Sequence, residues 1–168
     1  MSKHYEVIII GAGPSGLSTA LNLLNNGIKN ILVLERLKFP RYKCCAGYIT
    51  SKTKKEYESL GLNINQCHYS LIKDFKIVYQ YKEKQKIVNK FLFTNKNIDR
   101  VELDDKFFKL AKKKGINIEE NTYIIKHDIN KNKIKTNTKE TLTYDYLVFA
   151  DGTSGYGSKY QKKKQQNI

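Results

Sequence analysis

The sequence predicts an α/β fold of the doubly wound type, in which a parallel sheet is accompanied by an antiparallel β-meander. Two all-apolar runs, at residues 7–10 and 31–34, have the pattern of strands buried on both faces. Helical spacing separates them, over residues 14–26. Alternation of apolar and polar residues over 74–93 predicts an antiparallel hairpin. A length of 168 residues favours one domain with a sizeable core.

The first 35 residues predict one strand–helix–strand unit. The run Val7–Ile10 leads directly into a glycine turn, and Gly27 is a plausible end for the helix that follows. The apolar residues of that helix share one face: Leu17, Ala20, Leu21 and Leu24. Since the second apolar run ends at Glu35, residues 5–35 match half of a doubly wound sheet.

The remaining elements are predicted from periodicity and from helix and turn signals. A short helix is expected from about 51 to 60, with Thr53 and Glu56 at capping-box spacing. The hairpin is expected to turn near 82–84. A longer helix and three strands complete the pattern, at 99–114, 122–127, 133–137 and 145–150, with a turn at 130–132.

Composition excludes a disordered chain and argues against nucleic acid as a partner. Hydrophobic residues make up 40% and charged residues 28%, which is typical of a globular protein. The net charge of +15 raises nucleic acid or an anionic membrane surface as alternatives. The basic residues are nearly all Lys and are scattered, so a solvated Lys-rich surface is the favoured interpretation.

Cysteine usage and hydropathy favour a cytoplasmic location. The three cysteines form no paired framework, which fits a reducing compartment. No apolar run approaches the ~20 residues that span a bilayer, so the sequence gives no support for membrane association. Cys44 and Cys45 are adjacent rather than two residues apart, and the histidines are scattered, so no metal site is expected.

The glycine turn and the acid after the second strand predict a dinucleotide site. The turn Gly11-Ala12-Gly13-Pro14-Ser15-Gly16 opens the first helix. Gly11 permits the tight turn, Gly13 lets the backbone approach a pyrophosphate, and Gly16 allows close helix–strand packing. The helix N-terminus favours the anion. Glu35 can accept hydrogen bonds from both ribose hydroxyls of an adenosine, which favours FAD or NAD over NADP.

Four segments in the same order resemble the geranylgeranyl reductase family of FAD-dependent oxidoreductases, within the flavoprotein hydroxylase and reductase superfamily. The first is the glycine turn with Glu35. The second, from Phe39 to Thr50, is similar to the family's FPR-x-K-x-C-G-G-G-L-S stretch, with Cys45 on the family cysteine. The third is the Asp99-Arg100 helix start, and the fourth is the strand that runs into Asp151-Gly152. The resemblance implies a Rossmann-like FAD-binding domain.

The resemblance also implies roles for individual residues. Ser15 and its neighbours would hold the diphosphate, and Glu35 the adenosine ribose. Cys45 to Gly47 would pass along the flavin, Arg100 would reach FAD as a fixed cation, and the backbone near Ile124 would contact adenine. Asp151-Gly152 would close the site. The implied cofactor-binding set is Gly11, Gly13, Pro14, Ser15, Gly16, Glu35, Arg36, Cys45, Ala46, Gly47, Arg100, Ile124, Asp151 and Gly152.

Two of these residues have alternatives that the sequence leaves open. Cys45 is either a flavin-lining or redox residue or a small packing residue in a loop. Arg100 stands at a helix start, where the dipole disfavours a cation. Either an anionic ligand lies nearby, or Arg100 makes a plain surface ion pair with Asp99 or Asp104. No residue is assigned a catalytic role.

The activity implied by the resemblance is reduction of isoprenoid C=C bonds by FAD, with NADPH, NADH or ferredoxin as the external electron donor and an isoprenoid lipid as substrate. A monooxygenase or halogenase of the same superfamily is an alternative.

A second FAD motif of the kind G-D-A-A-G is absent, and so is most of the substrate domain. The chain therefore resembles a truncated N-terminal half. Residues 1–158 would form the FAD-binding domain, with a β-rich excursion at about 65–97 belonging to the substrate side and a disordered Lys/Gln tail at 159–168. A non-catalytic remnant, or a split half that needs a separate C-terminal half, is the other hypothesis.

Overall fold

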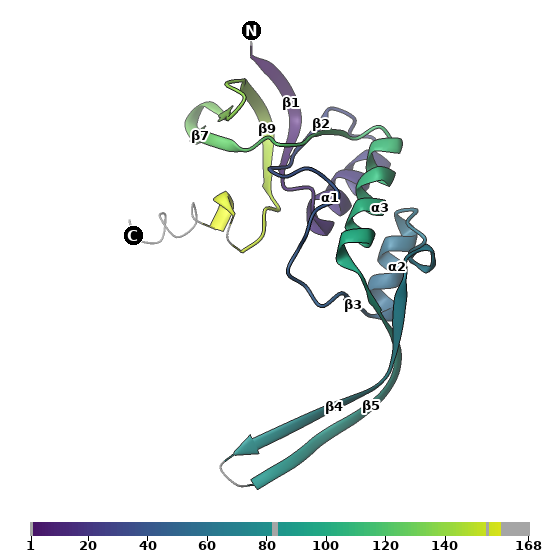
Figure 1. The fold of residues 1–168 in the computed structure, drawn as a ribbon. Helices are drawn as coiled ribbons and strands as arrows, with labels where there is room; N and C mark the ends of the chain where they lie inside the picture. Colours follow the sequence, from purple (N-terminus) through teal and green to yellow (C-terminus); the bar gives the residue numbers. More distant parts are fainter. Residues whose placement is uncertain (1, 82–83, 154, 159–168) are drawn as a thin grey trace. The chain divides into compact units, whose positions relative to one another are not determined.

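In the computed structural model, residues 2–81, 84–153 and 155–158 are described, so the predicted hairpin turn and the predicted tail lie at least partly outside them. The chain forms two compact units (Figure 1). One comprises the residues up to Arg41 together with those from Asp104 onward. The other comprises Tyr42–Leu103. Each unit contains one sheet.

The first unit contains a six-stranded sheet whose strand order is β6-β2-β1-β9-β8-β7. Strands β1 and β2 are parallel, as are β1 and β9, and β2 and β6. Strands β7, β8 and β9 are joined by antiparallel pairing. This arrangement confirms the predicted parallel sheet with an antiparallel meander. The strands are β1 (Lys3–Ile10), β2 (Ile31–Leu34), β6 (Asn117–Glu119), β7 (Ile124–Asp128), β8 (Lys133–Thr136) and β9 (Thr141–Phe149).

Helix α1 (Pro14–Asn25) connects β1 to β2 and confirms the predicted strand–helix–strand unit. It packs on both strands through its apolar face, where Leu17 and Leu21 are fully buried. Proline at the first helical position suits the helix because its missing N–H would have had no intrahelical partner. All four residues of β2 are buried, as expected for a strand covered on both faces.

The elements predicted between residues 99 and 150 are observed with ends shifted by up to four residues, and one strand was missed. Strand β6 was not predicted, because its three residues are too few to show a periodic pattern. The strand expected at 122–127 is β7, which begins at Ile124, and the strand expected at 145–150 is β9, which begins at Thr141. The expected helix at 99–114 is α3 (Arg100–Lys113). The expected turn at 130–132 is a short 3-10 turn, η2 (Ile129–Lys131), followed by a left-handed Asn132.

The second unit contains a three-stranded antiparallel sheet of order β3-β5-β4. Its strands are β3 (Tyr48–Ile49), β4 (Tyr69–Tyr81) and β5 (Lys84–Ile98), so the β4–β5 hairpin is longer than the predicted 74–93 (Figure 1). The unit also holds helix α2 (Ser51–Ser59) and a 3-10 turn, η1 (Ile64–Gln66).

Helix α2 begins at Ser51 as expected, but its capping residue differs from the prediction. The side chain of Thr50 accepts a 3.1 Å hydrogen bond from the backbone nitrogen of Thr53, which makes Thr50 the N-cap. The capping box expected at Thr53 and Glu56 is therefore wrong. Any Ser or Thr with a free N–H two or three residues later can cap a helix, and two threonines competed for that position here.

Candidate functional site

The glycine turn between β1 and α1 lies where β1, β2 and β9 end. The Gly11 nitrogen donates to the Leu34 carbonyl at 2.8 Å. Gly11 has a φ of +102°, and a methyl group there would lie 2.6 Å from the carbonyl oxygen of Ala150. A methyl group on Gly16 would overlap the carbonyl oxygen of Gly11. Gly11 and Gly16 are thus required by packing, because the backbone at both positions is too close to its neighbours for a side chain.

Gly13 differs from these two glycines. It is the N-cap of α1 with φ −74° and ψ 179°, a conformation that any residue can adopt. It makes no side-chain cap, and no acidic residue lies in the first helical turn. The first backbone N–H groups of a helix lack intrahelical partners and carry the positive end of the helix dipole. The turn therefore offers an anion-binding helix end with no side chain at Gly13.

Glu35 follows β2 directly, and its carboxylate points back to the glycine turn. The residue is only 4% exposed. Its Oε2 accepts a 2.9 Å hydrogen bond from the Ala12 nitrogen, and its Oε1 accepts one of 3.0 Å from the Leu37 nitrogen. Its own backbone is bonded on both sides, donating to Glu119 at 2.9 Å and accepting from Thr122 at 2.8 Å. A buried acceptor thus stands beside the turn, as the sequence predicts.

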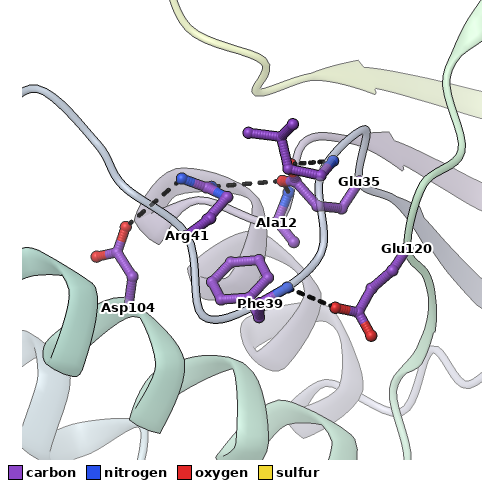
Figure 2. Close-up of polar contacts among 7 residues, drawn as sticks. Ala12, Glu35, Phe39, Arg41, Asp104 and Glu120 are labelled. Carbon is purple, nitrogen blue, oxygen red and sulfur yellow. Dashed lines mark hydrogen bonds and ion pairs between the residues drawn. The ribbon is translucent and has the colours of Figure 1, made fainter.

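The loop after Glu35 curls back so that Arg41 reaches the same carboxylate (Figure 2). Arg41 Nη2 lies 3.4 Å from Glu35 Oε2, and Nη1 lies 4.0 Å from Asp104 Oδ2 on α3. The guanidinium also stacks over the Phe39 ring, 4.6 Å from its centroid. Arg41 and Asp104 were not among the predicted site residues. The available signal was a cation six residues after Glu35, but the direction of its side chain depends on a loop that periodicity cannot place.

One face of α3 holds this loop through residues spaced four apart. Asp104 contacts Arg41, and Phe108 stacks on Phe39 with ring centroids 4.3 Å apart. Lys112 lies 3.8 Å from Glu120 Oε2, and Glu120 Oε1 accepts a 2.7 Å hydrogen bond from the Phe39 nitrogen. Side chains at i, i+4 and i+8 share one face of a helix, so α3 contacts the loop directly at two successive turns and through Glu120 at the third.

The remaining predicted residues of this unit lie around the same strand ends. Asp151 and Gly152 follow β9, and Asp151 Oδ2 accepts a 3.0 Å hydrogen bond from the Gly157 nitrogen. Arg36 is exposed. Ile124 is the first residue of β7, and its side chain is buried in the core rather than facing solvent. The segment that runs beside Glu35 is 119–122, which the sequence analysis did not single out.

Four predicted residues belong to the second unit, where three of them line one cavity. Cys45, Ala46 and Arg100 are among the residues around a volume of about 440 Å³. Gly47, the fourth residue, packs against the backbone of Ile98. It has a φ of +79°, and a methyl group there would overlap the Ile98 carbonyl oxygen.

The thiol of Cys45 is exposed and lies in a positive environment. A backbone hydrogen bond from Gly47 lowers the pKa of Cys45 from its ordinary value, desolvation opposes this, and the Arg100 guanidinium lowers it further. Arg100 is the first residue of α3, whose start is capped by Asp99: its Oδ1 accepts a 2.8 Å hydrogen bond from the Val101 nitrogen. Cys45 lines this cavity, and whether it lines a flavin or is a packing residue stays a prediction.

The described part of the chain contains neither a membrane-spanning helix nor a cluster of metal-ligating side chains. None of its helices is both long and apolar enough to cross a bilayer. Among the same residues, no three side chains of His, Cys, Asp or Glu gather in a way that could hold a metal ion.

Comparison with known proteins identifies the family of this arrangement. A family model described as "FAD binding domain" matches residues 4–163. An uncharacterized protein of Methanosarcina barkeri is 32% identical over 158 residues, which are 91% of this chain and 38% of that protein. A menaquinone reductase of Mycolicibacterium smegmatis is 31% identical over 62 residues, which are 37% of this chain and 15% of that protein.

A solved structure shows the same fold. It is PqsL of Pseudomonas aeruginosa, described as a probable FAD-dependent monooxygenase, with a TM-score of 0.73 and 16% identity. The match covers 96% of this chain and 46% of that one. The chain thus spans less than half the length of each of these three proteins.

Proposed function

This chain belongs to the FAD-binding domain family, and we propose that it holds the adenosine diphosphate end of FAD at the glycine turn and Glu35. The main support for this proposal is the buried Glu35 carboxylate. It is hydrogen-bonded to the Ala12 nitrogen, within the turn that would receive the diphosphate. In this proposal the α1 N-terminus binds the diphosphate and Glu35 binds the ribose.

The residues present fit this cofactor. Gly13 has no side chain beside the backbone that would receive a phosphate, and its ordinary backbone angles do not themselves require glycine. A carboxylate offers about four acceptor directions; the Ala12 nitrogen and Arg41 Nη2 take two on Oε2, and the Leu37 nitrogen takes one on Oε1. Oε1 of Glu35 therefore keeps acceptor capacity for a ribose hydroxyl. Segment 119–122, which is bonded to the Glu35 backbone, would lie toward the adenine.

The proposed reaction class is an FAD-dependent oxidoreductase. Bound flavin accepts and delivers hydride, while the protein orients it and tunes its surroundings. We assign the cavity around Cys45, Ala46 and Arg100 to the flavin side, where Arg100 would supply a fixed positive charge. The finer proposal is reduction of an isoprenoid C=C bond, with NADPH, NADH or ferredoxin as donor. It is supported by the Phe39–Thr50 stretch and by the similarity to a menaquinone reductase.

Two alternatives compete with the reductase. A monooxygenase is favoured by the name of the solved structure, although similarity at 16% identity carries the fold and not the reaction. The other is a split arrangement, in which this chain binds FAD weakly until a separate C-terminal half supplies the substrate side. Its motivation is that this chain matches only 38% of the Methanosarcina barkeri protein.

A visible spectrum of the purified 168-residue chain tests the proposal. A flavin absorption band, either as purified or after addition of FAD, is the expected result, and its loss in a Gly13→Val variant would place the diphosphate at the turn. A folded, colourless protein that binds neither FAD nor ADP would overturn it. Anaerobic mixing with NADPH or NADH, followed by mass analysis of an isoprenoid substrate, separates the reactions, since saturation adds two hydrogens and hydroxylation adds one oxygen.

A further inference from the structure

We propose that Arg41 is a positioning residue for the Glu35 carboxylate, and that Asp104 holds it in place. This inference rests on the proposed binding of an adenosine ribose by Glu35. It assigns the ribose preference of the site to a three-residue set, Glu35–Arg41–Asp104, drawn from β2's end, the following loop and α3 (Figure 2).

The charged side chains of Glu35, Arg41 and Asp104 are all largely buried, so each needs the opposite charge of its neighbour. The exposed fractions of the side chains are 6% for Glu35, 11% for Arg41 and 1% for Asp104. Charged side chains are rarely buried without a partner, because removing them from water is costly. Arg41 lies between the two carboxylates and offsets their charge. A substitution at Arg41 would therefore leave two buried acids without this shared cation.

The contact distances argue for orientation rather than a closed ion pair. Charge-assisted N–H···O bonds are about 2.7–2.9 Å long, whereas Arg41 lies 3.4 Å from Glu35 and 4.0 Å from Asp104. The short bonds to Glu35 come instead from the Ala12 and Leu37 nitrogens. Arg41 thus supplies positive charge beside Oε2 through a long hydrogen bond, while Oε1, which accepts from the Leu37 nitrogen, keeps capacity for a ligand hydroxyl.

The Phe39 ring supports the guanidinium, whose Nη2 donates a long hydrogen bond to Glu35 Oε2. Arg41 lies over Phe39, which stacks on Phe108 with an interplanar angle of 8°. Among the described residues, the buried Arg41 Nε has no hydrogen-bond partner. A lysine could keep a cation over the Phe39 ring but lacks the planar guanidinium that stacks on it and reaches two carboxylates, so lysine should replace Arg41 only in part.

The test compares two ligands that differ only at the ribose. Binding of ADP and of 2′,3′-dideoxy-ADP to the full chain is measured by calorimetry. Hydrogen bonds to a charged group predict that wild-type protein binds ADP roughly tenfold to a hundredfold more tightly. Arg41→Met and Glu35→Gln should each bring this ratio close to one, and Arg41→Lys should give an intermediate ratio. A variant that combines Arg41→Met with Glu35→Gln should show no further loss of this affinity ratio.

Lys109→Met is the matched control. Lys109 also lies on α3, but it is exposed and pairs with Asp105 at 2.6 Å. Loss of its charge should weaken both ADP ligands equally and leave their ratio unchanged. Equal weakening of both ligands by Arg41→Met would show that Arg41 contacts the phosphates or acts only in folding, and would overturn the proposal.

Two further outcomes separate the inference from its premise. A wild-type ratio of one would overturn the ribose role of Glu35, and the inference with it. A wild-type preference that Glu35→Gln abolishes but Arg41→Met and Arg41→Lys both retain would overturn the role of Arg41 alone. If Arg41→Met does not fold, Arg41→Lys and Asp104→Asn decide, since an unchanged ratio in both would contradict the proposal.

Discussion

Glu35 Oε2 accepts a 2.9 Å hydrogen bond from the Ala12 nitrogen, so the residue after β2 is tied to the turn after β1. Glu35→Gln should therefore affect both stability and binding. One of its two side-chain positions becomes an NH₂ group that faces a backbone N–H, either of Ala12 or of Leu37. Leaving a buried group unsatisfied costs about 1–3 kcal/mol, and we expect a loss of this size in the free energy of unfolding in urea.

The control for this prediction is Glu140→Gln. Glu140 pairs with Lys3 at 3.0 Å on the surface, where both side chains are substantially exposed. Exposed pairs contribute little, about 0–1 kcal/mol, so this variant should unfold and bind ADP nearly as wild type does. Comparable losses in the two variants would contradict the role given to Glu35.

Substitutions at the glycines should separate folding from binding. Gly16→Ala places a methyl group against the Gly11 carbonyl oxygen, where backbone must move, so the thermal midpoint should fall sharply. Gly13→Ala requires no change of backbone angle and should leave the midpoint within a few degrees of wild type, while ADP and FAD bind more weakly. Circular dichroism and calorimetry on both variants check this. A destabilised Gly13→Ala that binds normally when folded would count against the diphosphate position.

The sequence predicts where the glycine turn and Glu35 lie because the signals for both are local. The spacing of Gly11, Gly13 and Gly16 and the position of Glu35 depend only on one strand–helix–strand unit, whose periods are clear. The partnership of Arg41 with Asp104 was not predicted, because it depends on the path of an irregular loop and on which face of α3 meets it. Strand β6 was missed for a related reason: three residues have no period, and their pairing with β2 is a tertiary effect.

Thr50→Val should destabilise α2, because the structure makes Thr50 the N-cap. Valine keeps the shape but cannot accept the hydrogen bond from the Thr53 nitrogen. Loss of an N-cap costs about 0.5–2 kcal/mol, which urea unfolding followed by far-ultraviolet circular dichroism can measure. Thr53→Val removes only a hydroxyl contact to Thr50, at 2.9 Å, and should cost less. A larger loss of stability in Thr53→Val than in Thr50→Val would indicate that Thr53 is the N-cap, as the sequence pattern predicted.

Cys45 should react with iodoacetamide at lower pH than an ordinary thiol. The Gly47 hydrogen bond, opposed by desolvation and aided by Arg100, lowers the pKa of Cys45, and the thiolate is the reactive form. The alkylation rate of Cys45, measured against pH in a Cys44→Ser background, should therefore rise at a lower pH than that of free cysteine. Arg100→Met should move the profile to higher pH, whereas Lys52→Met, an exposed change on α2, should not. Superimposed profiles for Arg100→Met and its parent would contradict the assigned role of Arg100.

His127 should make the protein less stable as the pH falls. Burial lowers the pKa of His127 below its ordinary value of 6.5, against an opposing effect of Asp128. The unfolded chain then takes up this proton near pH 6.5, and the folded protein does so only at lower pH. The stabilising contribution is therefore complete above the ordinary value and is lost as the pH falls through the lowered one.

A His127→Gln variant tests this contribution while keeping a polar group for Tyr144, whose hydroxyl lies 2.6 Å from His127 Nε2. Urea unfolding from about pH 7.5 to about pH 5.5 should show the wild-type free energy falling more steeply than that of the variant. Because the ring also lies 6.2 Å from Phe149, protonation would place a positive charge in an aromatic cluster at the end of β9. Parallel pH profiles for the two proteins would show that His127 titrates alike in the folded and unfolded chains.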